Sequence, residues 1–154
     1  MKKILIVLLA LMLAGCMGYV PGQQSYWDAR VREMCEKDGG VTIFESIGVS
    51  AAQATTLPRI GPYISIPPRK SVKSDALAFW DESVTVFHDG NPRVWRSEQV
   101  IRRHSDEKII ARAVRYIRVG GDLPSPAHSS GFTCPDENEL LAQREKVFVI
   151  NGER

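Results

Sequence analysis

Histidine, serine and aspartate, the residue types that form the catalytic triad of a serine hydrolase, occur together at two places in the sequence. The two groups are the tripeptides His104-Ser105-Asp106 and His128-Ser129-Ser130. The members of a triad meet in space from separate segments, so consecutive residues on a turn do not normally aim at one reacting atom. The GxSxG motif of a nucleophile elbow is also missing from the sequence. We therefore interpret both groups as exposed turn residues and expect no catalytic residue.

Patterns that bind metals or nucleotides are likewise missing. The sequence has no HExxH, no P-loop and no GxGxxG motif. The histidines His88, His104 and His128 are too widely separated to have the spacing of zinc ligands. We expect no metal, no cofactor and no enzymatic activity.

The first residues of the chain resemble the signal peptide of bacterial lipoproteins. Lys2 and Lys3 precede an apolar run over residues 4–14, which is shorter than the roughly 20 residues that a membrane-spanning helix needs. The run ends in Leu13-Ala14-Gly15-Cys16, which resembles the lipobox, where small residues precede an obligatory cysteine. The resemblance implies cleavage after residue 15 and lipidation of Cys16, with a diacylglyceryl group on sulfur and an acyl chain on the new amine.

Three acyl chains would hold the protein stably on a membrane, because two or more chains are enough for stable anchoring. Lipoproteins of enteric bacteria with aspartate after the cysteine stay on the inner membrane, whereas this chain has Met17. The resemblance therefore implies the periplasmic face of the outer membrane. We expect residues 16–25 to form a lipidated tether and residues 26–150 to form a single domain.

The charge of the mature chain does not indicate binding to nucleic acid. Removal of residues 1–15 deletes two of the 20 basic residues and none of the 18 acidic ones, which leaves a formally neutral chain. Nucleic-acid-binding domains usually carry a marked excess of basic residues. We therefore expect the membrane, and an envelope protein or anionic glycolipid, as partners.

Cys35 and Cys134 remain once Cys16 is lipidated, and an even number of cysteines outside the cytoplasm favours a disulfide. Their loop of about 100 residues would gain much stability from closure. The alternatives are two free buried thiols or a metal pair, but neither cysteine lies in a CxxC motif or near a suitably spaced histidine. We expect a bridge that joins the two ends of the domain.

The first expected elements are a helix and a strand. Ser25 is the expected N-cap, Trp27, Val31 and Cys35 recur at helical spacing, and Gly39-Gly40 ends the helix. Residues 41–47 (VTIFESI) are typical of a strand.

Residues 48–74 give a weaker signal. Residues 50–56 suit one or two helical turns, and residues 57–70 contain four prolines, which favour an extended or polyproline-like segment. We interpret this segment as a loop that crosses the domain surface, and a PxxP-type ligand is the alternative.

Residues 83–119 predict a three-stranded antiparallel meander. Strands over 83–88, 93–104 and 108–119 would be joined by turns at 89–92 and 105–107. The alternative for 108–119 is a helix, because its apolar residues also fit one helical face. We favour the strand because the flanking lengths match and because residues 114–119 form the run Val-Arg-Tyr-Ile-Arg-Val.

The rest of the chain predicts a loop over 120–133, a short helix from Pro135 to about Glu145 and a last strand over 147–150. The fold class is therefore α+β, with an N-terminal helix packed on a small antiparallel meander, a short C-terminal helix and one disulfide.

The meander also carries the main charge asymmetry, since residues 91–118 contain eight basic residues and three acidic ones. In a strand, Arg112 and Arg118 share a face with Val114 and Tyr116, while Arg115 lies opposite. Arg112, Tyr116 and Arg118 are thus candidates for a face that binds an anionic partner. The alternative is a solvated face whose charges are balanced by the acidic residues Asp136, Glu137 and Glu139.

Several segments together resemble a family of small uncharacterised proteobacterial lipoproteins: residues 32–40 (REMCEKDGG), 94–98 (VWRSE), 120–122 (GGD) and 132–135 (FTCP). The resemblance supports the pairing of Cys35 with Cys134 and implies no catalytic residue. The expected function is a non-enzymatic structural or interaction module on the envelope. The alternative is a ligand-binding or inhibitor module that recognises an anionic partner through the basic sheet face.

Overall fold

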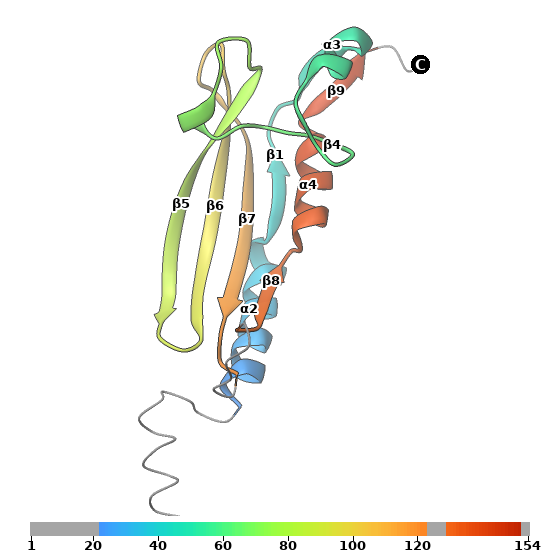
Figure 1. Ribbon diagram of the computed structural model, residues 1–154. Helices are drawn as coiled ribbons and strands as arrows, with labels where there is room; N and C mark the ends of the chain where they lie inside the picture. The colour runs from blue at the N-terminus through green and yellow to red at the C-terminus, as the bar shows by residue number, and fades with distance from the viewer. Residues whose placement is uncertain (1–21, 123–128, 152–154) are drawn as a thin grey trace, which may run out of the picture.

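Three long antiparallel strands form the centre of the computed structural model, which describes residues 22–122 and 129–151 (Figure 1). They are β5 (Ala78–Asp89), β6 (Arg93–Arg103) and β7 (Ile109–Val119). The predicted meander and the α+β class are confirmed, and residues 109–119 form a strand rather than a helix. β5 begins five residues earlier than the predicted start at residue 83. The prediction missed these residues because Asp81 and Glu82, which lie within the strand, interrupt the apolar pattern.

The outer edge of β7 is paired with two short strands that lie end to end. β1 (Gly40–Ile43) pairs with residues 111–114, and β8 (Gly131–Cys134) pairs with residues 116–119. The loop predicted over 120–133 is therefore wrong at its end. Four residues carry little strand signal of their own, and β8 is a strand because it completes the hydrogen bonds of β7.

The N-terminal helix α2 (Gln23–Asp38) packs on one face of this sheet. Its buried residues Val31 and Cys35 contact Val94, Val114 and Tyr116 from β6 and β7. The prediction that Ser25 caps the helix is wrong: Gly22 is the N-cap, with a φ of 83° that glycine adopts without strain. Ser25 lies inside the first turn.

A second group of short elements lies at the end of the domain opposite to the start of α2 (Figure 1). β2 (Ile47–Ser50) pairs in parallel with β9 (Phe148–Asn151), so the predicted strand over 41–47 is in fact β1 and the first residue of β2. α3 (Ala51–Thr56) begins with a capping box between Ser50 and Gln53, and α4 (Glu137–Glu145) is capped by Asp136. The short helix predicted after Pro135 is confirmed.

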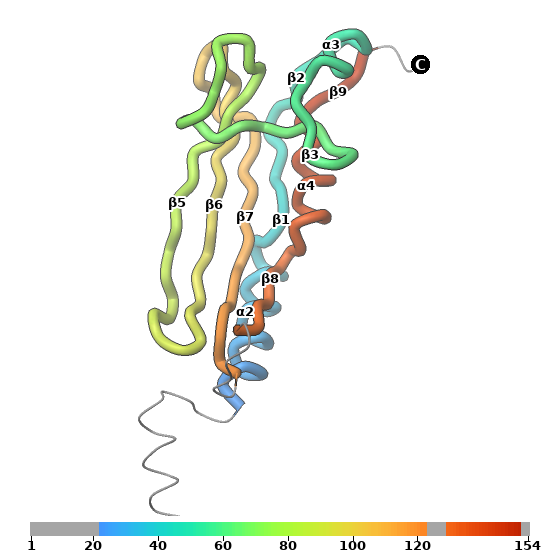
Figure 2. Tube along the Cα trace, viewed as in Figure 1, coloured from blue at the N-terminus to red at the C-terminus, as the bar shows by residue number. Residues whose placement is uncertain are grey.

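The proline-containing segment after α3 crosses the sheet, as Figures 1 and 2 show. It contains a small hairpin of β3 (Arg59–Ile60) and β4 (Tyr63–Ile64) and the 3-10 turn η1 (Arg69–Ser71). Arg69 ties the end of this crossing segment to the sheet, since it donates to Asp81 at 2.7 and 3.1 Å and to Glu107 at 3.2 Å. These bonds lower the pKa of both carboxyl groups.

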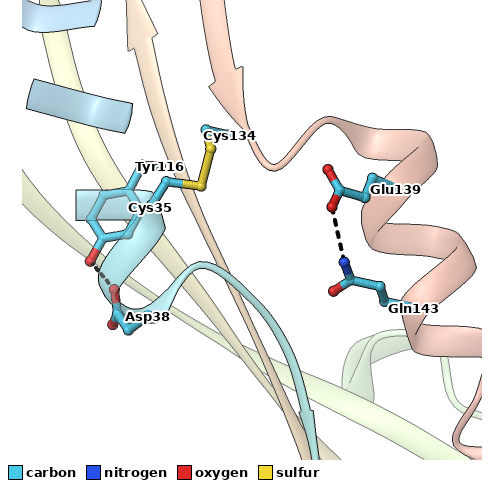
Figure 3. The surroundings of a disulfide bond; sticks show 6 residues. All are labelled: Cys35, Asp38, Tyr116, Cys134, Glu139 and Gln143. Carbon is cyan, nitrogen blue, oxygen red and sulfur yellow. Dashed lines mark hydrogen bonds between the residues drawn. A yellow bond between two sulfur atoms is a disulfide. The ribbon is translucent and has the colours of Figure 1, made fainter. Parts of the chain in front are cut away.

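The disulfide between Cys35 and Cys134 links the N-terminal helix to the C-terminal part of the chain, and the α-carbons of the two residues lie 5.9 Å apart (Figure 3). Cys35 lies in the last turn of α2, as predicted, and Cys134 is the last residue of β8 rather than part of a loop. Beside the bridge, the hydroxyl of Tyr116 donates to Asp38 at 2.6 Å. No helix in the described ranges is both long and apolar enough to cross a membrane.

Replacement of both cysteines, as Cys35→Ala with Cys134→Ala, should lower the free energy of unfolding by about 2 to 5 kcal/mol. The loss follows from the longer reach of the unfolded chain once the large loop is open, whereas the β5–β6–β7 meander keeps its own pairing. Urea unfolding followed by circular dichroism measures both quantities. An unchanged unfolding midpoint, or loss of the sheet signal in the absence of urea, would contradict this expectation.

The Arg69 ion pairs should make stability sensitive to acid. A carboxyl group with a lowered folded pKa stabilises the fold above its unfolded pKa of about 4. That contribution is lost as the pH falls through the folded pKa of Asp81 and Glu107. Urea unfolding at pH values between about 7 and 3 should therefore show a shallower acid loss for Arg69→Met than for the unchanged protein. Parallel curves for the two proteins would refute this origin of acid sensitivity.

Candidate functional site

The three residues predicted to face an anionic partner do share one face of β7, but α2 covers much of that face. Tyr116 is buried against α2 and bonded to Asp38. Arg112 is half-exposed, with a guanidinium nitrogen 3.7 Å from the carboxylate of Glu98. The charge of Arg112 is therefore partly neutralised within the sheet, by Glu98 rather than by the acidic residues near α4.

Arg118 is used inside the fold. Only 2 % of its side chain is exposed, and its Nε donates to Asp28 on α2 at 2.8 Å. Its Nη1 donates to the carbonyl of Gly120 at 2.7 Å and to the carbonyl and hydroxyl oxygens of Ser130 at 3.1 and 2.7 Å. Arg118 thus joins α2 to the ends of β7 and β8. The predicted face does not reach the surface at Tyr116 and Arg118, because the helix needs both residues as contacts.

The histidine and serine groups are not brought together in the described ranges. The ring of His104 packs edge-on against Phe79, with 6.1 Å between the ring centroids, and Asp106 pairs with Arg103 at 2.9 Å. His128 lies outside the described residues. Within residues 22–122 and 129–151, no three side chains of His, Cys, Asp or Glu lie together as metal ligands would.

The opposite face of the sheet contains a cavity of about 460 Å³ beneath α4 and the crossing segment. Four residues of the sheet line it: Trp80 and Glu82 of β5, Gln99 of β6 and Arg115 of β7. Leu140 and Arg144 of α4, with Ile66 and Pro67 of the crossing segment, also line this space.

Arg144 is the most buried charged group of the cavity. It follows Leu140 by one helical turn, and the residue is only 8 % exposed. Its hydrogen bond within the described residues is a long one, 3.4 Å, to the carbonyl of Ile66, and its Nε has no partner there. The carbonyl of Ile66 also accepts from the indole of Trp80 at 2.9 Å, so the two donors share one acceptor.

Arg115 and Gln99 bring further polar groups to the cavity that have no partner among the described residues. Arg115 extends from β7 on this face and is half-buried, with an unpartnered Nε. Gln99 is 7 % exposed, and its carbonyl oxygen accepts no hydrogen bond. No carboxylate oxygen of the described residues lies within 4.0 Å of either Arg115 or Arg144. Two donors and one acceptor thus line one buried space without partners.

The acidic residues of the cavity lie at its rim. Glu82 and Glu137 are exposed, and Glu82 accepts a hydrogen bond from the hydroxyl of Ser97 at 2.5 Å. The pKa of Arg144 is lowered to about 10, chiefly by burial and then by the charge of Arg115, while Glu137 opposes this shift. Arg144 therefore stays protonated at neutral pH, although its surroundings disfavour the charge.

The buried and half-buried arginines differ in whether a carboxylate lies close to the guanidinium group. Arg118 is more deeply buried than Arg144, yet it has one carboxylate and three further acceptor contacts. Arg102 and Arg112 each have an unpartnered Nε, but carboxylates lie 3.3 and 3.7 Å from their guanidinium nitrogens. A buried charge is costly unless it is paired. Arg144 carries that cost, and the cavity is therefore the candidate site.

Another cavity, of about 390 Å³, lies between the crossing segment and the start of β5. Its charged residues Lys73 and Asp75 are exposed. Exposed charges remain solvated and give no sign of a missing partner.

The residues of the candidate site were not selected from the sequence, although a signal was present. Arg115 was expected on the face opposite to Arg112 and Arg118, which is where it lies. Arg144 continues the buried stripe of Leu140 at a spacing of four residues, so a charged residue occupies a core position of the helix. Recognising the pair required knowing that α4 and this face of β7 line one cavity.

Comparison of the chain with protein-family models, with curated proteins and with solved structures finds no match in any of the three.

The two buried arginines should respond in opposite ways to replacement by methionine. Arg144→Met should raise the free energy of unfolding by about 1 kcal/mol, because it removes an unpaired buried charge and keeps the apolar stem. Arg118→Met should lower it by about 3 to 5 kcal/mol, because it leaves Asp28 and several acceptors without their donor. Urea unfolding at neutral pH measures both values. A loss of stability in Arg144→Met as large as that in Arg118→Met would show that Arg144 is a structural residue.

Proposed function

We propose that the protein is an envelope lipoprotein, anchored by lipid on Cys16, whose folded domain acts as a non-enzymatic binding module. The anchor is supported by the order of residues 2–16, in which two lysines, an apolar run and Leu-Ala-Gly precede the cysteine. Removal of residues 1–15 would leave Met17 after the lipidated residue, a sequence that favours the outer membrane over retention on the inner one.

A binding role is supported by one observation above all, the unsatisfied Arg144 in the cavity. Natural proteins retain an unpaired buried charge where function compensates for the loss of stability. The cavity also has the size of many small-ligand sites, which range from about 300 to 1,000 Å³. A ligand that supplies the missing partners would stabilise the folded domain.

The chemistry of the cavity favours binding over catalysis. Guanidinium groups, an amide and an indole orient and neutralise a ligand, but protonated arginines do not exchange protons readily at neutral pH. The lowered pKa of Arg144, about 10, still lies well above neutral pH. The domain is therefore proposed to hold a ligand rather than to transform it.

The placement of the cavity suits a domain that is anchored at its N-terminal end. α2 begins at one end of the domain, whereas the crossing segment and α3 lie toward the other end (Figures 1 and 2). A lipid attached ahead of α2 would thus hold the domain by the end that lies away from the crossing segment. The cavity would face the aqueous space beside the membrane.

The anchor is tested by the substitution Cys16→Ser. In a bacterial host, metabolic labelling with palmitate should mark the unchanged protein and should be lost in the variant, which should accumulate as unprocessed precursor. Cys35→Ala with Cys134→Ala is the matched control, since it removes the other cysteines and should keep the label. Labelling that survives Cys16→Ser would refute the lipoprotein assignment.

A further inference from the structure

The cavity beneath α4 carries an inference about the class of ligand, and this inference rests on the proposed binding function. We propose that it binds a small organic acid: a single carboxylate accepts hydrogen bonds from Arg115 and Arg144, while a donor group on the ligand bonds Gln99 or the acidic rim.

The cationic part of the cavity calls for an anion. Arg115 and Arg144 both line it, each has an Nε without a partner, and no carboxylate of the described residues lies within 4.0 Å of either. A guanidinium group offers parallel N–H donors whose spacing matches the two oxygens of a carboxylate. One carboxylate would therefore supply the acceptors and the charge that both side chains lack.

The rest of the lining calls for hydrogen-bond donors on the same ligand. The carbonyl oxygen of Gln99 is buried and has no donor. Glu82 and Glu137 lie at the exposed rim and make the charged lining formally neutral, two arginines against two glutamates. A phosphate dianion would bring a second negative charge toward these carboxylates. A monocarboxylate with an ammonium or amide N–H at its other end matches both parts of the cavity.

Apolar walls join the two ends of this site. Trp80 lines the cavity from the sheet, Ile66 from the crossing segment, and Leu140 and Leu141 from α4. Methylene groups between the carboxylate and the donor would contact these residues. Both a free amino acid of extended shape and the carboxyl-terminal end of a short peptide have this chemistry.

Two matched probes test the inference on the full mature protein, purified in a non-ionic detergent. 5-Aminopentanoate carries a carboxylate and an ammonium group separated by methylenes, and 5-aminopentanamide lacks only the negative charge. The indole N–H resonance of Trp80, assigned with a Trp80→Phe variant, reports on binding because this group donates to Ile66 in the cavity wall. We expect 5-aminopentanoate to shift this resonance with a dissociation constant on the order of 1 mM. Equal shifts with the amide, or none with the acid, would overturn the inference.

Variants of the two arginines test the position of the carboxylate. Arg115→Met and Arg144→Met should each weaken binding of 5-aminopentanoate at least about tenfold, as loss of a hydrogen bond to a charged group predicts. Arg93→Met, which removes an exposed arginine of β6 outside the cavity lining, is the control and should bind as the unchanged protein does. Unchanged binding in either cavity variant would overturn the inference. Arg144→Met is expected to fold at least as stably as the unchanged protein, so its loss of binding would not reflect unfolding.

Two further measurements distinguish a peptide terminus from a free small acid, and the ligand inference from the proposed lipid anchor. Tighter binding of triglycine than of 5-aminopentanoate would assign the site to a peptide terminus, and the reverse order would assign it to a free small acid; both results support the inference. Palmitate labelling of Cys16 is independent of these titrations. A labelled protein that binds neither probe would overturn the inference about the ligand and leave the lipid anchor in place.

Discussion

The pairing of β7 on both of its edges is the constraint on which the rest of the structure depends. β6 pairs with one edge along its whole length, while β1 and β8 divide the other edge between them. β1 directly follows α2 and β8 directly precedes α4. The pairing of these two strands with β7 therefore also brings both helices next to the sheet. The disulfide lies near the point where the two short strands approach each other, and it joins α2 to the end of β8 (Figure 3).

Each face of the sheet is covered by elements that bury one arginine, and the two arginines differ in their partners. On the α2 face, Arg118 receives a carboxylate from the helix and carbonyl groups from the chain beyond β7, and its charge becomes a structural contact. On the α4 face, Arg144 and Arg115 line one cavity, and no carboxylate of the described residues lies within 4.0 Å of either. One domain thus contains a buried arginine with a carboxylate partner, Arg118, and a buried arginine without one, Arg144. The stability of one variant can therefore be compared directly with that of the other.

Much of the fold could be predicted because its long elements carry strong local patterns. The alternation Val-Arg-Tyr-Ile-Arg-Val marked β7 as a strand, and Gly39-Gly40 marked the end of α2. The cysteine pair was predicted from the even number of cysteines, the expected compartment, the absence of metal-binding spacing and the family resemblance. The last strand, predicted over 147–150, is present as β9 (Phe148–Asn151). β8 and the parallel pairing of β2 with β9 could not be predicted, because four-residue strands are stabilised by partners far away in the sequence. The candidate site could not be predicted for the same reason, because Arg115 and Arg144 come together only in the folded structure.

The division of one edge between the two ends of the chain has a consequence for how the molecule is made. Synthesis proceeds from the N-terminus, so β7 emerges while half of that edge still lacks β8 and while Cys35 lacks Cys134. Residues 40–134 are the shortest segment that contains β7 together with all of its strand partners. The fold is completed only when its last elements arrive, and until then the polypeptide remains an incomplete sheet with an open edge.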